Sequence, residues 1–295
     1  MSLRVVRAIG LITVQDHGRP GRMHMGLAAG GAVVREWLAL ANRRVDNPDD
    51  AAGIEVMGEL TVVAEAPVRV ATEREPARVL QPGDELTVAS REVRVSYLAV
   101  HGGIDAPVML GSRSTQLSAG IGTLIRTGAT LEVQRVAGAE LGRHPPRGRA
   151  RRPALGPDTW FPDPGAGPSV VAVVSGPDLD AFAPGAIEAL ASSVWIVSAE
   201  CSRVGTRLDG PPLPRRAAGE ATRPMVCGAI EVPADGRPIV LGPEHPTTGG
   251  YPVIGVVAHA DLGTFFATGV GQPVRFSVRA APSVSATPQS PSHHR

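Results

Sequence analysis

Apolar and polar residues alternate over short stretches of this chain, which is the pattern of half-buried β-strands. In the first half, an apolar run at 5–14 changes abruptly into polar and turn-forming residues. Over 87–100, valines alternate with Arg94 and Ser96 before a continuously apolar end, so we predict one strand that enters the core. Two turn sequences, 81–84 and 126–129, each precede another alternating stretch, at 85–88 and 130–133.

Helical periodicity is clearest between Val34 and Val45, where Trp37 and Leu38 fall on the same apolar face. Asn47-Pro48 follows this pattern and ends the predicted helix. In the second half, 178–190 is a second, shorter helical candidate, interrupted at Pro184-Gly185. Strands are predicted at 194–197, 229–232, 239–241, 254–257 and 274–276.

The organisation along the chain indicates two domains. Residues 138–168 hold seven prolines and no apolar periodicity, so we interpret them as a linker between domains at 1–137 and 169–279. The end, 280–295, has the composition of a disordered tail. With 35 Gly, 28 Pro and only 3% aromatic residues, the chain is predicted to be mainly β, with two small barrels and a few short helices.

The charge content excludes several kinds of chemistry. The chain has no lysine, so it cannot carry biotin, form a Schiff base or use a Walker-type lysine. A formal net charge of +1 gives no field for nucleic acid, and the densest basic cluster lies within the linker. Cys201 and Cys227 form no CxxC pair. No signal peptide and no apolar stretch of about 20 residues is present, so we expect a cytoplasmic protein without membrane contact.

The first cluster of candidate site residues follows the apolar run at 5–14. Gln15 is suited to recognise an amide or carboxyl group, Asp16 to accept a proton, and Arg19 to hold an anion. The alternative is that Asp16 and Arg19 form a structural pair that braces a turn.

The second cluster lies around 110–115. Its hydroxyls and guanidinium suit a phosphate or carboxylate and come from four consecutive residues, Ser112, Arg113, Ser114 and Thr115. A hydroxyl-rich turn with a solvated arginine is an equally good interpretation of this segment. The nearby His101 is better interpreted as a hydrogen-bonded rim residue than as a ligand or base.

The third cluster combines two arginines four residues apart, Arg203 and Arg207, with the polar segment 242–252. Within that segment Glu244 is a candidate acid or base, and the remaining candidates are Thr247, Thr248 and Tyr251. Tight turns also use threonine and glycine, so a structural role is equally possible. No HxH, HExxH or GxSxG motif occurs, and we predict no metal site.

Taken in order, the segments TVQDHGR, GSRST, GAIEVPADGRP and TTGGYP resemble the carboxyltransferase-domain family called allophanate hydrolase subunit 2, which is also the C component of 5-oxoprolinase. The resemblance implies two cyclophilin-like β-barrel subdomains. It also implies a partner, the B component (an allophanate hydrolase subunit 1-like protein), with the active groove between the two chains. ATP with Mg²⁺ at that groove, a small amide substrate and a LamB/YcsF-like ring-opening protein are further implications.

The resemblance further implies an ATP-dependent 5-oxoprolinase, which opens the lactam of 5-oxoproline to glutamate. Two alternatives stay open, a non-catalytic regulatory partner of the B component and a urea-pathway carboxyltransferase that receives biotin from another chain. Three departures bear on activity: Val34 and Ser202 stand where the family has carboxylates, and Glu231 replaces a glutamine.

Overall fold

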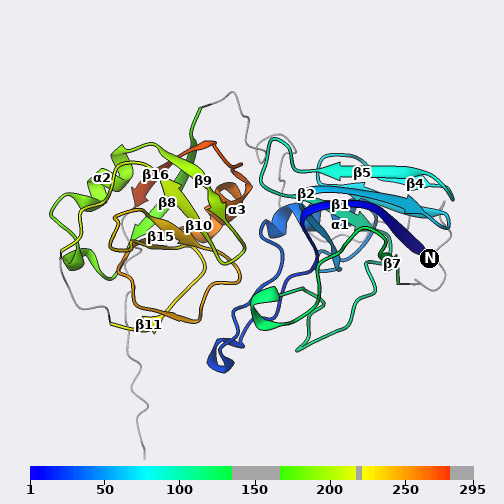
Figure 1. Ribbon diagram of the computed structural model, residues 1–295, viewed down its shortest axis with the longest axis horizontal. Coiled ribbons are helices and arrows are strands. Elements are labelled where there is room, and N and C mark those ends of the chain that lie inside the picture. The colour runs from blue at the N-terminus through cyan, green and yellow to red at the C-terminus, as the bar shows by residue number, and fades with distance from the viewer. Residues whose placement is uncertain (135–166, 217–220, 280–295) are drawn as a thin grey trace, which may run out of the picture.

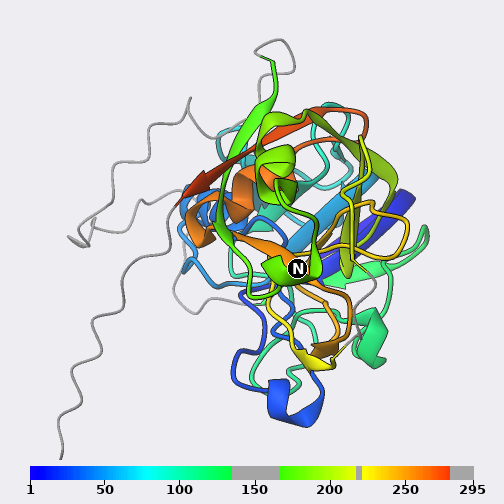
Figure 2. The same ribbon diagram turned by 90° about the vertical axis from the view of Figure 1, so that its left-hand side faces the viewer.

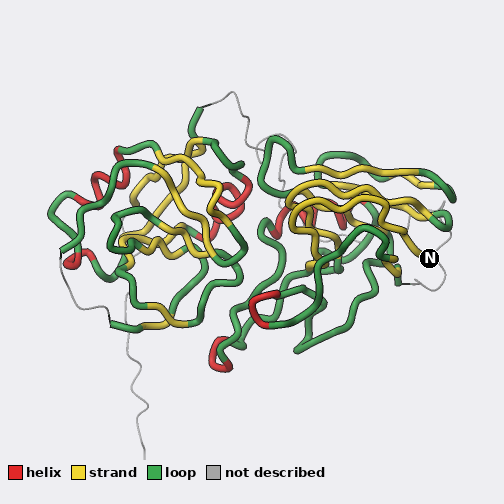
Figure 3. The backbone as a smooth tube through the Cα atoms, viewed as in Figure 1, coloured by secondary structure: helices red, strands yellow, loops and turns green. Residues whose placement is uncertain are grey.

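The computed structural model describes residues 1–134, 167–216 and 221–279. The predicted linker, apart from its last two residues, and the predicted tail at 280–295 lie outside the described residues. In the described part the chain is mainly β, as predicted, and it forms two strand-built subdomains with few short helices (Figures 1 and 3).

The N-terminal subdomain is an open, half-barrel sheet. Its strands run in the order β4-β3-β6-β2-β1-β7, and β5 pairs with β2 beside this path. The bounds are β1 (Ser2–Gln15), β2 (Gly53–Ala64), β3 (Val68–Thr72), β4 (Arg78–Leu80), β5 (Glu85–Ala89), β6 (Ser96–Val100) and β7 (Thr130–Glu132). The longest pairing joins β1 to β2 from Leu3↔Ala64 to Gln15↔Gly53, and it places the end of β1 beside the start of β2.

The C-terminal subdomain is a closed barrel with strand order β10-β13-β12-β15-β8-β16-β9. These strands are β8 (Ser169–Ser175), β9 (Trp195–Cys201), β10 (Gly205–Asp209), β12 (Ala229–Glu231), β13 (Ile239–Leu241), β15 (Val253–Val257) and β16 (Pro273–Arg279). A separate two-stranded ribbon pairs β11 (Arg223–Pro224) with β14 (Thr248–Gly249). Thus the barrel predicted for the second half closes, whereas the sheet of the first half stays open.

The helices are short. The predicted helix of the first half is α1 (Arg35–Arg44), with Trp37 and Leu38 buried, and it packs on β3 and β6. The second candidate is split as predicted, into η3 (Leu179–Ala181) and α2 (Ala186–Ser192). The remaining elements are η1 (Met23–Met25), η2 (Leu117–Ala119), η4 (His259–Asp261) and α3 (Leu262–Ala267). Among the described residues, no helix is long and apolar enough to cross a bilayer.

The two subdomains share one hydrophobic core. A single cluster of buried side chains includes Trp37 and Tyr97 of the N-terminal sheet and Trp195 and Phe266 of the barrel. A second cluster lies inside the N-terminal sheet alone. Helix α3 lies on the side of the barrel that faces the N-terminal subdomain (Figures 1 and 2). The two subdomains therefore pack against each other through apolar side chains.

One predicted strand is wrong. The stretch 87–100 is divided into β5 and β6, and residues 90–95 between them form no strand. Arg94, which alternation assigns to a solvent-facing position, is only 7% exposed. Its backbone N–H donates to Ala267 of the barrel, and its guanidinium donates to Ser202 and Thr206 there. The connection turns away from the sheet because it makes contacts between the subdomains.

Candidate functional site

Asp16, directly after β1, joins the first and second clusters of predicted site residues. Its carboxylate accepts hydrogen bonds from the backbone N–H groups of Gly18 (2.7 Å) and Arg113 (2.6 Å). It also accepts from the hydroxyls of Ser112 (2.6 Å) and Ser114 (2.5 Å). Four donors occupy the acceptor positions of a carboxylate, so Asp16 holds the 112–114 segment against the end of β1.

Gln15 and Arg19 are also used inside the protein. The Gln15 amide is fully buried and donates to Thr13 Oγ1 and to the carbonyl of Thr115, both at 3.0 Å. The Arg19 guanidinium, 2% exposed, donates to the carbonyls of Ser114 (2.6 Å) and Met109 (3.3 Å) and to Gln116 Oε1 (3.2 Å). Burial lowers the pKa of Arg19, against the raising effect of the Asp16 charge. Arg19 therefore braces the 109–116 loop, with carbonyl and amide oxygens as its acceptors.

A cavity of about 260 Å³ lies beside this loop. Asp16, Ser112 and Arg113 line it together with His17, Asp50 and Gln134. The Arg113 guanidinium lies 3.3 Å from Asp105 and donates to the carbonyl of Ala106. The cavity is thus polar and open to solvent, and it is the place where the second cluster can meet a ligand.

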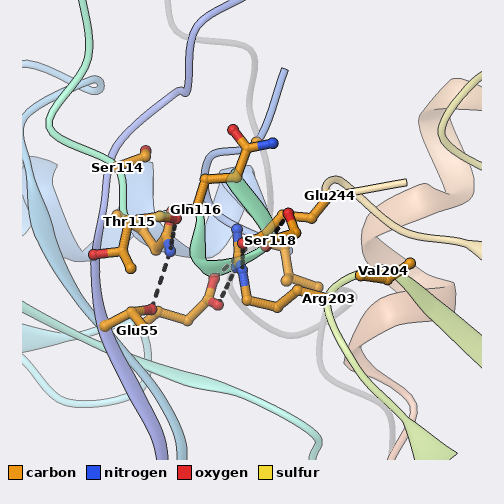
Figure 4. A network of polar contacts seen from close by, with 12 residues as sticks. Glu55, Ser114, Thr115, Gln116, Ser118, Arg203, Val204 and Glu244 are labelled. Carbon is orange, nitrogen blue, oxygen red and sulfur yellow. Dashed lines mark hydrogen bonds and ion pairs between the residues drawn. The ribbon is translucent and has the colours of Figure 1, made fainter. Parts of the chain in front are cut away.

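Arg203 is the centre of a buried network between the subdomains (Figure 4). Its guanidinium donates to Glu244 at 2.5 Å, to Glu55 of β2 and to the carbonyl of Gly31 at 2.6 Å. The side chains of Arg203, Glu55 and Glu244 are 3%, 1% and 4% exposed. Burial acts to lower the pKa of Arg203, but the two carboxylates raise it, so this guanidinium is firmly charged. All of these acceptors belong to the protein, so Arg203 joins the two subdomains.

The same network caps the start of α1. Glu55 accepts from the backbone N–H of Val33 and from the hydroxyl of Tyr97, both at 2.8 Å, and Val34 N–H donates to that hydroxyl at 2.9 Å. Val34 itself is the N-cap residue and makes no side-chain cap. Two of the N–H groups that a helix start leaves without intrahelical acceptors are therefore satisfied by Glu55 and Tyr97. This explains how the helix begins at Val34 without a carboxylate.

The third cluster is spread over different surroundings. Thr248 lies in the β11–β14 ribbon, Thr247 accepts from Met225 N–H through its carbonyl, and Tyr251 is 41% exposed. Arg207 lies on the outer face of β10, paired with Glu200 at 2.9 Å and Asp235 at 3.2 Å. The two arginines thus separate, with Arg203 inside and Arg207 outside.

Contacts across the subdomain boundary connect the third cluster to the others. Ser118, in η2, donates to Glu244 Oε2 at 3.2 Å, and Gly30 N–H donates to the carbonyl of Pro243 at 3.0 Å. The three predicted clusters are therefore linked by one series of contacts. Glu55, Tyr97 and Arg94 belong to the same region and were missed, because each lies in a stretch with the pattern of an ordinary strand.

Glu231, which departs from the family pattern, ends β12 and is 6% exposed. One of its carboxylate oxygens has no hydrogen-bond partner among the described residues. Burial raises the pKa of this carboxyl. A Cβ added to Gly249 would lie 2.6 Å from the same oxygen, so Glu231 lies directly under the Thr247–Gly250 loop.

A second cavity, of about 200 Å³, lies between the subdomains. Residues from the start of α1, from 243–245 and from α3 line it, among them Arg35, His245 and Phe266. Cys227 also lines it, and both cysteines are free thiols. Within the described residues, no three His, Cys, Asp or Glu side chains come together to hold a metal ion.

Comparisons with known proteins agree with this architecture. The family model for the carboxyltransferase domain, subdomain A and B, matches residues 25–278. The chain is 31% identical to the C component of 5-oxoprolinase from Escherichia coli K12, over 93% of this chain and 90% of that protein. It is also 29% identical to the urea amidolyase of Lachancea kluyveri, over 85% of this chain but only 15% of that protein.

Solved structures give the same picture. The crystal structure of TTHA0988 matches with a TM-score of 0.77 and 27% identity over 94% of this chain. This chain spans only 55% of TTHA0988. Kluyveromyces lactis urea amidolyase matches with a TM-score of 0.79 at 24% identity, over 93% of this chain and 18% of that one, which shows a common fold.

Proposed function

This chain belongs to the carboxyltransferase-domain family of subdomains A and B, and from that premise we propose that it is the C component of an ATP-dependent 5-oxoprolinase. One observation carries the proposal: the match to the C component of the E. coli 5-oxoprolinase runs along nearly the whole length of both chains. The match to urea amidolyase covers a small part of a much longer protein. A free-standing protein of this kind therefore fits the oxoprolinase better than the carboxylase.

In the proposed reaction, the amide oxygen of 5-oxoproline attacks the γ-phosphorus of ATP and ADP leaves. Water adds to the activated carbon, the C–N bond breaks, and the ring nitrogen keeps the electron pair and takes up a proton. A second water attacks the same carbon and releases phosphate, which gives glutamate. The B component, an allophanate hydrolase subunit 1-like protein, completes the groove, and a LamB/YcsF-like protein opens the ring.

The arginines decide how this chain can contribute. Arg19, Arg113, Arg203 and Arg207 each contact protein oxygens. We therefore assign the nucleotide phosphates and their Mg²⁺ chiefly to the partner's side of the groove. The polar cavity at Ser112 and Arg113, together with Thr247, Thr248 and Tyr251, is this chain's contribution to that groove. With no lysine, the chain carries no biotin.

The test is ATP hydrolysis by this chain mixed with the purified B component and the ring-opening protein. The proposal predicts ADP release that requires 5-oxoproline and stops when this chain is omitted. Absence of turnover, with all three proteins folded and the complex formed, would refute it.

The alternative is a non-catalytic partner of the B component, and one observation favours it. Asp16 and Arg203, two of the candidate site residues, use their hydrogen bonds to hold the fold together. In that case the complex forms without any 5-oxoproline-dependent turnover, and Arg113→Ala leaves complex formation unchanged. Turnover that is lost in Arg113→Ala while the complex persists would exclude this alternative.

A further inference from the structure

We propose that the cavity between the subdomains binds a small cyclic amide that carries a carboxylate, with His245 Nε2 accepting the ring N–H. The inference rests on the proposed function and gives that function a substrate site. This cavity lies between α1, the 243–245 segment and α3, apart from the polar cavity at Arg113.

The cavity has the size and the walls of a small-molecule site. Its volume is about 200 Å³, and its apolar surface comes from Ala32 and Val33 on one subdomain and Leu262 and Phe266 on the other. Val33 and Phe266 are 6% and 1% exposed, so these walls belong to the packed core. Sites for small ligands are typically concave and apolar, with a few placed polar groups. A ring of methylene groups fits against such walls.

His245 is the buried polar group of this cavity. It is 5% exposed, and its Nδ1 lies 2.8 Å from the carbonyl oxygen of Pro246. A carbonyl oxygen only accepts, so Nδ1 carries the hydrogen, and the Nε2 of the neutral ring is an acceptor. The described residues provide no hydrogen-bond partner for Nε2, and the side chain lines the cavity. A ligand N–H therefore satisfies a buried acceptor there.

Charge at the cavity favours an anionic group on the ligand. Arg35, in the first turn of α1, donates to the carbonyl of Gly30 at 3.3 Å, and among the described residues it makes no ion pair. Its positive charge reaches Cys227, because it acts to lower the pKa of that thiol. Burial dominates and raises the Cys227 pKa to about 11, so the thiol is neutral at physiological pH. The cavity thus offers one cation, one neutral acceptor and a neutral thiol.

A lactam carboxylate matches this set of groups. Its ring N–H meets His245 Nε2, its methylenes lie on the apolar walls, and its carboxylate faces Arg35. An amine such as proline puts a charged NH₂⁺ where the ring N–H belongs and has no lactam carbonyl. A cyclopentane carboxylate has no N–H at all. The three compounds therefore separate the contribution of the amide from that of the acid.

The experiment measures binding of 5-oxoproline to the full chain by isothermal titration, with cyclopentanecarboxylate and 2-pyrrolidinone as matched fragments. We expect 5-oxoproline to bind and each fragment to bind at least about tenfold more weakly, because each lacks one polar contact. His245→Phe should weaken binding by about tenfold or more, and His24→Phe, on the exposed η1, should not change it. Equal binding to wild type and His245→Phe would overturn the proposal.

Cys227 provides a second readout that needs no change in the cavity. In Cys201→Ser protein, Cys227 is the only cysteine, and bound 5-oxoproline should slow its reaction with a maleimide. No protection at saturating 5-oxoproline would overturn the cavity site. Turnover by the reconstituted enzyme without binding here would contradict this inference but leave the proposed function standing. Protection without any turnover would support the site and contradict the proposed function.

Discussion

Replacing Arg203 with methionine tests the structural role that the network assigns to this residue. Methionine keeps much of the side-chain volume but removes the guanidinium that Glu55 and Glu244 share. The two carboxylates are 1% and 4% exposed and would then lack their only cationic partner in the network. The carbonyl of Gly31 would also lose a donor.

The expected loss is large. Removing one partner of a buried ion pair costs about 3–5 kcal/mol, because the remaining charge stays buried without compensation. This is a substantial part of the roughly 5–15 kcal/mol by which folded domains are stable. Arg207→Met is the matched control, since Arg207 is 29% exposed and its partners Glu200 and Asp235 are 67% and 47% exposed. Surface pairs of that kind contribute about 0–1 kcal/mol.

Urea unfolding, followed by circular dichroism and tryptophan fluorescence, measures both variants. Arg203→Met should unfold at much lower urea than wild type, and Arg207→Met close to wild type. Adding Glu55→Gln and Glu244→Gln to Arg203→Met should recover part of the loss, because no buried charge is then left unpaired. Equal destabilisation by the two arginine substitutions, or no recovery in the triple variant, would refute the assignment.

Three further predictions concern other parts of the described chain. Asp16→Asn should cost about 1–3 kcal/mol and speed hydrogen exchange at Gly18 and Arg113, because two N–H donors lose a carboxylate; unchanged exchange would contradict this. Burial raises the folded-state pKa of Glu231 above the ordinary value of 4.5, so the folded form binds the proton more tightly and the stability present below that value is lost as pH rises through the folded-state pKa. Glu231→Gln should therefore melt above wild type at pH 8, and the difference should shrink towards pH 4; a pH-independent difference would contradict this. Gly58→Ala should cost more than about 1 kcal/mol, because φ is +135° and its Cβ would lie 2.1 Å from the Ile9 carbonyl oxygen, whereas Gly21→Ala has nothing within 4 Å and should cost less when both are melted.

Local patterns were enough to predict much of the fold. Helix α1 follows from its apolar spacing, and the strands of the barrel follow from short apolar runs between turn residues. Closure of one barrel and not the other depends on strand pairing between distant segments, which periodicity does not record. The stretch 87–100 failed for a related reason, since Arg94 has the spacing of a solvent-facing residue but is buried against the second subdomain.

The candidate site was predicted in part for the same reason. Motifs that are contiguous in sequence identified Asp16 and the 112–115 segment, and the structure brings these together. Their individual roles depend on partners that are far away in the chain. Arg203 meets Glu55 across 148 positions, and nothing local to either residue marks that pair. His245 likewise gained its importance only from the cavity that surrounds it.

The central claim, that this chain helps to activate a lactam by phosphorylation, is tested most directly by following the amide oxygen. The measurement uses 5-oxoproline labelled with ¹⁸O at the lactam carbonyl, the reconstituted complex and ATP, and it determines the isotope content of the inorganic phosphate by mass spectrometry. The account predicts that ¹⁸O passes into phosphate as glutamate forms, and that both products require this chain. Glutamate formed together with unlabelled phosphate, or formed equally well without this chain, would contradict it.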